Sequence, residues 1–160
     1  MLTLQAGRFL ISAYKKAQRG KKVSLSVAYL NNLADLQSKT CSASSVDDLE
    51  SIQEAFDVTC THFIKIAFEA FHKLKQQGET TENAHLKSSL QKSTAAKLHA
   101  MNTMFSVFRN TIASADVSIQ SKLISLCQVF GLSLISEEAG NFLMASYYQS
   151  LHIEAVNEKV

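Results

Sequence analysis

The chain of 160 residues contains no proline and only 5 glycines. Average usage of about 5% would place roughly eight prolines in a chain of this length. Proline interrupts the hydrogen bonds of a helix interior, whereas the turns of β-sandwiches and β-barrels depend on proline and glycine. The composition therefore favours long helices and argues against sandwich and barrel folds.

Apolar residues at the start of the chain recur with helical spacing over 2–19. We expect a first helix there, ended by Gly20 at the position after the helix, where glycine is favoured. The stretch 21–30 alternates like a strand but has no partner strand. An extended segment or a short helix is therefore expected over 21–30, followed by a polar loop over 31–44.

The rest of the sequence predicts longer helices. A second helix starts near 44–47, with Ser45 and Asp48 in a cap-like pattern, and stops at Gly78. Its apolar stripe is close to a heptad seam, and extra phenylalanines widen it beyond a coiled coil, which indicates burial in a bundle. The remaining helices are expected over 81–113 (with Leu86 and Leu90 on its apolar side), over 116–130 up to a break at Gly131, from Ser136 onward, and over 153–160.

These patterns predict an all-α fold, an antiparallel helical bundle of about five to six helices. The length of 160 residues suits one domain, residues 1–160, with a core of its own.

No motif for catalysis or metal binding emerges from the residues. Glu137 and Glu138 are adjacent, so they point about 100° apart on a helix and cannot act on one atom. We expect both to stabilise the first turn of the fifth helix. The five histidines contain no pair at i,i+3 or i,i+4, so solvated or capping roles are expected, and the three cysteines lack a C-x-x-C pair and are expected as free thiols in a reducing compartment. No catalytic residue and no metal ligand is predicted.

Basic residues cluster around the end of the first helix. Two interpretations stay open: the cluster complements the carbonyl end of the helix, or it holds a phosphate or a nucleotide tail. Its five members fall within eight positions and are Lys15, Lys16, Arg19, Lys21 and Lys22.

The formal net charge is only +2, so nucleic-acid binding is not expected. No apolar run approaches the length of a membrane-spanning helix, and the N-terminus has no signal-peptide pattern, so neither a span nor a secretory signal is predicted.

Two groups of motifs stand in a specific order across almost the whole chain. The first comprises Leu2-Thr-Leu-Gln-Ala-Gly-Arg-Phe-Leu10, Ser12-Ala-Tyr14, Gly20-Lys and Val27-Ala-Tyr-Leu-Asn31. The second comprises Leu123-Ile-Ser-Leu-Cys127, Gly131, Ile135-Ser136, Glu138-Ala-Gly-Asn-Phe-Leu143 and Ile153-x-x-Val156-Asn157. In order and spacing the chain resembles the C-terminal helical region of peroxisomal acyl-CoA oxidases.

This resemblance implies a function. Acyl-CoA oxidases are flavoproteins in which a glutamate abstracts the α-proton of a fatty acyl-CoA and FAD takes the β-hydride, giving a trans-2-enoyl-CoA. Oxygen then reoxidises the flavin and yields hydrogen peroxide. The resemblance also implies peroxisomal fatty acid β-oxidation, a dimer with the flavin near the subunit boundary, and cofactor-binding roles for Gln5 and Arg8.

The chain departs from the family in what it lacks. The glutamate of the family lies in a Glu-Gly-Asp/Glu-Asn motif just before the Gln-x-x-Arg block, and neither that motif nor a flavin-binding β-domain occurs here. We expect a fragment, incomplete at both ends and inactive alone, that works with the remaining oxidase domains or a second oxidase subunit. The alternative is a stand-alone helical interaction module derived from the oxidase, which binds an intact oxidase subunit or a lipid.

Overall fold

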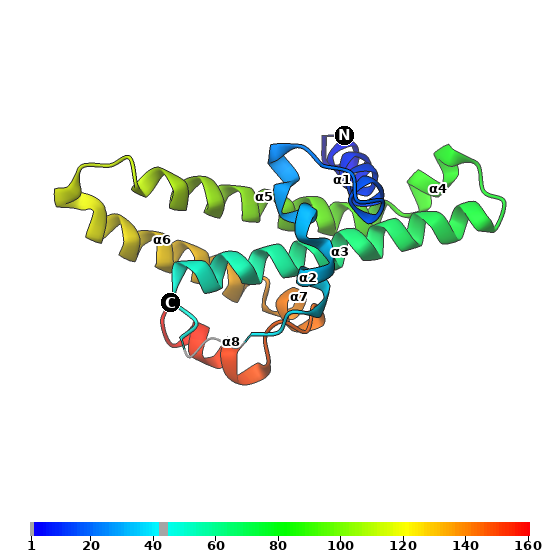
Figure 1. Ribbon diagram of the computed structural model, residues 1–160. Helices are drawn as coiled ribbons and strands as arrows, with labels where there is room; N and C mark the ends of the chain where they lie inside the picture. Colours follow the sequence, from blue (N-terminus) through cyan, green and yellow to red (C-terminus); the bar gives the residue numbers. More distant parts are fainter. Residues whose placement is uncertain (1, 42–44) are drawn as a thin grey trace. The chain divides into compact units, whose positions relative to one another are not determined.

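The computed structural model of the protein describes residues 2–41 and 45–160 (Figure 1). Helices account for all the regular structure of this described part, and no strand occurs in it, so the expected all-α class is confirmed. The helices are α1 (Leu2–Gln18), the 3-10 helix η1 (Leu25–Asn32), α2 (Leu33–Ser38), α3 (Leu49–Gln76), α4 (Thr81–Lys87), α5 (Ser89–Ile112), α6 (Val117–Glu137), α7 (Ala139–Met144) and α8 (Ser150–Asn157).

The helices pack into two compact units. The first combines residues 2–38 with 60–100, and the second combines 39–41, 45–59 and 101–160. The long helices α3 and α5 each contribute one part to each unit.

The core of the first unit forms around α1. Tyr14 is buried, and its ring centroid lies 5.2 Å from that of Phe68 on α3. The Tyr14 hydroxyl accepts a hydrogen bond of 2.7 Å from Nε2 of Gln37 on α2. An aromatic ring with a satisfied hydroxyl contributes both burial and orientation, so Tyr14 fixes α1 against α3 and α2.

The end of α1 is the one predicted from the sequence. Gly20 has a φ of +67°, which is favourable only for glycine. Its N–H donates to the Ala17 carbonyl at 2.9 Å, and the Lys21 N–H donates to the Lys16 carbonyl at 3.1 Å. These two bonds form a Schellman motif, which turns the chain back along the helix that it has just left.

The segment after α1 is more regular than expected. Of the two structures expected over 21–30, the short helix is confirmed by η1, whereas η1 and α2 replace much of the polar loop expected over 31–44. Val27, Leu30 and Leu36 of these helices are buried. Tertiary packing of these three residues stabilises helices that are too short to form alone. Positions 42–44 of the expected loop lie outside the described residues.

The single helix expected over 81–113 is divided. α4 ends at Lys87, and Ser88, with φ −94° and ψ 18°, separates it from α5. The buried Ser88 hydroxyl donates to the Ala84 carbonyl at 2.6 Å, a bond that competes with the helical ladder and bends helices. Thr80 caps the start of α4, because its Oγ1 accepts a hydrogen bond of 3.2 Å from the Asn83 N–H.

The second unit is built around Phe56 of α3. Its ring stacks on Phe105 of α5 at 5.5 Å and meets the edge of Phe142 of α7 at 5.3 Å, and all three side chains are fully buried. α3 begins at Leu49 because Asp48 accepts a hydrogen bond of 3.0 Å from the Ser51 N–H. The capping residue Asp48 thus lies next to the expected start at 44–47. Position 44 of that range lies outside the described residues.

The expected break at Gly131 is wrong, since α6 continues through it to Glu137. Gly131 is buried, and a Cβ at this position would lie 2.6 Å from Cε2 of Phe105 and 2.8 Å from Cγ2 of Ile52. The glycine therefore allows close helix packing and does not end the helix.

The expected start of a helix at Ser136 is also wrong. Ser136 and Glu137 end α6, Glu138 follows as its C-cap, and α7 begins only at Ala139. Glu137 therefore lies at the carbonyl end of a helix and not in a first turn. Glu138 precedes α7, where its carboxylate accepts a hydrogen bond of 2.6 Å from Nδ2 of Asn141.

The final helix is α8, Ser150–Asn157, rather than 153–160. His152 Nδ1 accepts a hydrogen bond of 3.0 Å from the Gln149 N–H at its start, so the capping role expected for the histidines is confirmed for this one.

Replacing Gly131 by alanine is predicted to destabilise the protein. The new methyl group must displace Phe105 or Ile52, and overpacking of this kind costs about 1–3 kcal/mol. Urea unfolding followed by circular dichroism measures the loss. Gly140→Ala is the matched control, because no atom lies within 4 Å of its added Cβ. Equal stability of the two variants would contradict the packing role of Gly131.

Candidate functional site

Gln5 and Arg8, which the resemblance implies as cofactor-binding residues, lie on the exposed surface of α1. Gln5 and Arg8 are both exposed and stand one helical turn apart, so their side chains are neighbours on the helix. Gly7 between them is buried, and a Cβ there would lie 2.5 Å from Cβ of Lys92. The glycine thus lets α1 approach the α5 backbone closely and brings Arg8 near Lys92.

Lys92 is a buried cation. Its side chain is only 1% exposed, and Nζ donates to the carbonyl oxygen of His85 and lies 3.3 Å from Nδ1 of the same residue. No ion pair of Lys92 with an acidic side chain is present in 2–41 or 45–160. Burial and then the charge of Arg8 lower the pKa of Lys92. Burial and the charges of Lys92 and Arg8 likewise lower the pKa of His85, whose ring stacks on Phe71 at 4.4 Å.

Sequence reasoning missed Lys92 because it placed the apolar face of this segment on Leu86 and Leu90. Those two side chains are 68% and 74% exposed. The buried face runs instead through Ala84, Ser88 and Lys92. The signal in the sequence is a spacing of four residues, which joins the small residues Ala84 and Ser88 and continues to Lys92.

The group formed by Arg8, His85 and Lys92 offers hydrogen-bond donors and positive charge. It contains no carboxylate. Two cations and an imidazole without an acidic side chain among them suit the binding of an oxygen-rich or anionic group.

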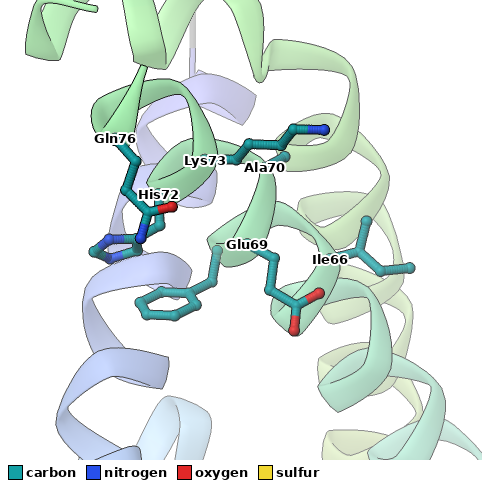
Figure 2. A pocket seen from close by; sticks show the side chains of 7 residues that line it. Ile66, Glu69, Ala70, His72, Lys73 and Gln76 are labelled. Carbon is teal, nitrogen blue, oxygen red and sulfur yellow. The ribbon is translucent and has the colours of Figure 1, made fainter. Parts of the chain in front are cut away.

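A depression of about 550 Å³ lies along α3, and Figure 2 shows its lining side chains. The ring of His72 lies 4.2 Å from that of Phe68, and burial together with the charge of Lys15 lowers the pKa of His72. All seven lining residues belong to α3, and they are Ile66, Phe68, Glu69, Ala70, His72, Lys73 and Gln76.

Because one helix lines the whole depression, these residues provide a floor but no opposite wall. Glu69 is 4.0 Å from Lys65 in an exposed ion pair, and nothing in the lining excludes water from its carboxylate. Acid–base catalysis needs a group held against the proton that it moves. The depression is better suited to packing against another polypeptide segment.

The most deeply held carboxyl group of the second unit has a structural role. Oδ1 of Asp57 accepts hydrogen bonds from Nε2 of Gln53 at 3.1 Å and from Nδ2 of Asn102 at 2.8 Å, and Gln53 also donates to Oδ1 of Asn102 at 2.7 Å. Burial raises the pKa of Asp57. A shifted carboxyl is a common sign of an active site, but Asn102 here ties α5 to α3 by donating to Asp57 and by accepting from Gln53.

Metal and thiol chemistry find little support. In the described part of the chain, no three His, Cys, Asp or Glu side chains gather in a group that could hold a metal ion. Cys41, Cys60 and Cys127 form no disulfide in the described part of the chain.

The outer face of α6 is apolar. Ile119, Leu126 and Val129 follow one another at helical spacing and are exposed, Leu126 by 59%. α6 is also the one helix within 2–41 and 45–160 that is long and apolar enough to cross a membrane, with 28% of that window buried. Length and composition are weak evidence for a span, since the core helix of a soluble protein meets the same criteria.

Asp57→Asn is predicted to be at least as stable as the wild type near pH 7. Its remaining oxygen still accepts from Gln53 and Asn102, while the buried charge is gone. The folded-state pKa of Asp57 lies above its ordinary value of 3.8, so the wild-type free energy of unfolding falls as pH rises between the two values. The advantage of the variant should therefore shrink as the pH is lowered toward 3.8. Urea unfolding over this pH range measures both effects.

Asp57→Ala is the contrasting variant. It removes the acceptor of Asn102 Nδ2 and one of the two acceptors of Gln53 Nε2, and it should lose about 1–3 kcal/mol. A D57N variant as unstable as D57A near pH 7 would show that the carboxylate charge itself stabilises the fold.

Comparison with known proteins adds to this geometry. A family model described as acyl-CoA oxidase matches residues 48–160. The whole chain is 30% identical to acyl-coenzyme A oxidase 2 of Yarrowia lipolytica, of which it covers 23%. It is 28% identical to peroxisomal acyl-coenzyme A oxidase 1 of Homo sapiens, of which it covers 25%. The chain thus spans about a quarter of the length of these relatives.

Solved structures agree with the sequence relatives. The crystal structure of acyl-CoA oxidase 3 from Yarrowia lipolytica has a TM-score of 0.94 and 31% identity, over 99% of this chain and 23% of that one. Acyl-CoA oxidase-1 of Caenorhabditis elegans, solved in complex with FAD and ATP, has a TM-score of 0.86 over 99% of this chain and 24% of that one. At 21% identity, this second likeness shows the fold alone.

Proposed function

The chain belongs to the acyl-CoA oxidase family, and from this premise we propose that it forms the C-terminal helical part of an FAD-dependent acyl-CoA oxidase. Such an enzyme converts fatty acyl-CoA to trans-2-enoyl-CoA and releases hydrogen peroxide in peroxisomal fatty acid β-oxidation. The observation that carries the proposal is the family match over 48–160, and the TM-score of 0.94 to a solved oxidase supports it. The name of the human relative supports a peroxisomal location for this enzyme.

We propose that the 160-residue chain alone is catalytically inactive. The base that abstracts a proton must lie within about 2.6–3.2 Å of it in a site that holds the substrate. Asp57 is engaged by two amides, and Glu69 stands on the surface of a single helix. The base and the walls of the substrate site therefore come from other parts of the enzyme.

FAD, when bound, accepts the hydride of the acyl chain and passes the electrons to oxygen. Gln5 and Arg8 fit such a cofactor because their amide and guanidinium groups are exposed, and because Arg8 stands near Lys92, which has no carboxylate partner in the described residues. We propose that Gln5 and Arg8 bind and orient FAD by hydrogen bonds to its oxygen atoms. The solved C. elegans relative that binds FAD supports the cofactor assignment.

The exposed surface of the chain supports a proposal about its partners. We propose that the exposed apolar face of α6 packs against the remaining oxidase domains or a second oxidase subunit, as a dimeric enzyme requires. Exposed apolar side chains at helical spacing are a common mark of such contacts. The assignment of residues 1–160 to one domain stays a prediction.

The alternative function is a stand-alone helical interaction module. The same exposed face of α6 would then bind an intact oxidase subunit or a lipid. The two proposals differ in the size of the natural polypeptide and in the behaviour of the isolated chain.

The native polypeptide is predicted to be about four times as long as this chain, because the chain covers 23% of its curated relative. Antibodies raised against 48–160 would recover it from cells, and the precipitate should contain flavin and form peroxide with a fatty acyl-CoA. Recovery of a 17.6 kDa polypeptide without flavin or peroxide formation would favour the interaction module instead.

Self-association of the isolated chain is predicted to depend on α6. Leu126→Glu places a charge in the exposed apolar face, so it should reduce the association seen by sedimentation velocity. Leu25→Glu is the matched control, because Leu25 is 95% exposed and lies on η1, outside this face. A wild-type chain that stays monomeric, or equal effects of the two changes, would argue against an apolar interface on α6.

A further inference from the structure

The short helix α4 is attached to the first unit through a small part of its surface. Figure 1 shows it between the end of α3 and the start of α5. Most of its residues are exposed, whereas Ala84 is buried and His85 is half-buried. A helix of 7 residues is too short to form alone, so its stability depends on the contacts of Ala84 and His85.

Two joints bound this segment. On one side, after α3 has ended, Gly78 adopts a φ of +87°. On the other side, Ser88 departs from helical geometry, with φ −94° and ψ 18°. The ion pair between Glu79 and Lys87 joins the two ends of the segment to each other and not to α5. The segment can therefore leave α5 without disturbing the helical hydrogen bonds of α3 or α5.

His85 provides the contacts that hold α4 in place. Its ring stacks on that of Phe71 on α3, with centroids 4.4 Å apart and an interplanar angle of 25°. Nζ of Lys92 on α5 donates to the carbonyl oxygen of His85 and lies 3.3 Å from its Nδ1. One buried ammonium group thus binds both the backbone and the ring of the same residue.

The contact with Lys92 requires a neutral ring. An ammonium group donates hydrogen bonds and cannot accept one, so Nδ1 of His85 is the acceptor and the ring proton lies on Nε2. A second proton on the ring would occupy Nδ1, where it would face Nζ of Lys92. The hydrogen bond would then be replaced by repulsion between two cations.

The surroundings of His85 oppose its protonation. Lys92 on α5 and Arg8 on α1 carry positive charge, and Glu82 on α4 itself carries the opposing negative charge. From α3, the apolar ring of Phe71 covers the imidazole. Burial, followed by the charges of Lys92 and Arg8, holds the pKa of His85 below its ordinary value of 6.5, and the charge of Glu82 offsets part of this effect. Release of α4 would return the ring to water and to its ordinary pKa.

We propose that His85 and Lys92 form a pH-sensitive latch, which holds α4 against α5 while His85 is neutral and releases α4 when His85 is protonated. Histidine is the side chain that commonly serves as such a switch near neutral pH. Because the released state binds the proton more readily, the docked state is fully stabilised above pH 6.5 and loses this stabilisation as the pH falls below 6.5. The latch is independent of the cofactor roles proposed for Gln5 and Arg8, since it requires only contacts within the first unit.

The test is amide hydrogen exchange of the 160-residue chain, measured by NMR between about pH 7.5 and 5.5. The reporters are the N–H groups of Ala84 and Ser88, which donate to the carbonyls of Thr80 and Ala84. Their protection factors, which are corrected for the direct effect of pH on exchange, should fall at least about threefold over this range. One proton on a group with an ordinary pKa of 6.5 limits the fall to about tenfold. Amides of α3 around the buried Ile64 should keep their protection, because the release is local.

His85→Asn removes the titrating group and keeps an acceptor, since Oδ1 of asparagine lies roughly where Nδ1 of histidine does. Protection of α4 should be lower in H85N than in wild type, because the stack on Phe71 is lost, but it should not change with pH. His62→Asn is the matched control. His62 also belongs to the first unit, burial also lowers its pKa, and it lies on α3 outside the latch. H62N should keep the pH dependence of the wild type.

Lys92→Met tests the cation. Methionine keeps an unbranched apolar stem but does not repel a protonated ring. In K92M the pKa of His85, followed by the NMR signals of its ring, should rise toward 6.5, and the pH dependence of α4 protection should shrink. An unchanged pKa of His85 in K92M would show that Lys92 only fills space, and it would overturn the latch.

Three further results would contradict the proposal. The first is protection of α4 in the wild type that stays constant between about pH 7.5 and 5.5. The second is a pH dependence in H85N equal to that of the wild type, which would assign the titration to another group. The third is an equal loss of protection in α4 and around Ile64, which would show that acid destabilises the whole unit and does not release α4.

Discussion

Burial of the apolar face of α3 is the interaction on which both units depend. Its first part brings Phe56 into the aromatic contacts of the second unit, and its second part brings Phe68 to Tyr14 in the first unit. A helix of 28 residues gains little from intrinsic propensity compared with the burial of such a face. The short helix α7 is stable because Phe142 covers part of this face, whereas η1 packs against α1 and α2.

The long helices could be predicted from the sequence because their apolar spacing is a local property. Their interruptions could not, because these depend on what each residue meets in space. Gly20 ends α1 through its own φ, whereas Gly131 looks similar in the sequence and is instead a contact point for Phe105. Likewise Ser88 breaks a helix through one buried hydrogen bond that no pattern of apolar residues indicates.

The residues of the candidate site also differ in whether the sequence alone could identify them. Gln5 and Arg8 were identified from the family resemblance, and no periodicity would have selected them. Lys92 was missed because a lysine in a helix is usually solvent-exposed, and only the packing of Gly7 on its Cβ explains its burial. Residues without an unusual local signal become functional candidates only when tertiary structure brings them together.

Two features of this chain cost stability when the chain is alone. Lys92 is buried and has no acidic partner within the described residues, and the outer face of α6 carries exposed apolar side chains. Burying a cation without a counter-charge is unfavourable, and so is exposing apolar surface to water. Packing of other parts of the proposed oxidase against α6 would recover part of this free energy. The balance therefore favours a polypeptide that reaches its lowest free energy in a larger assembly.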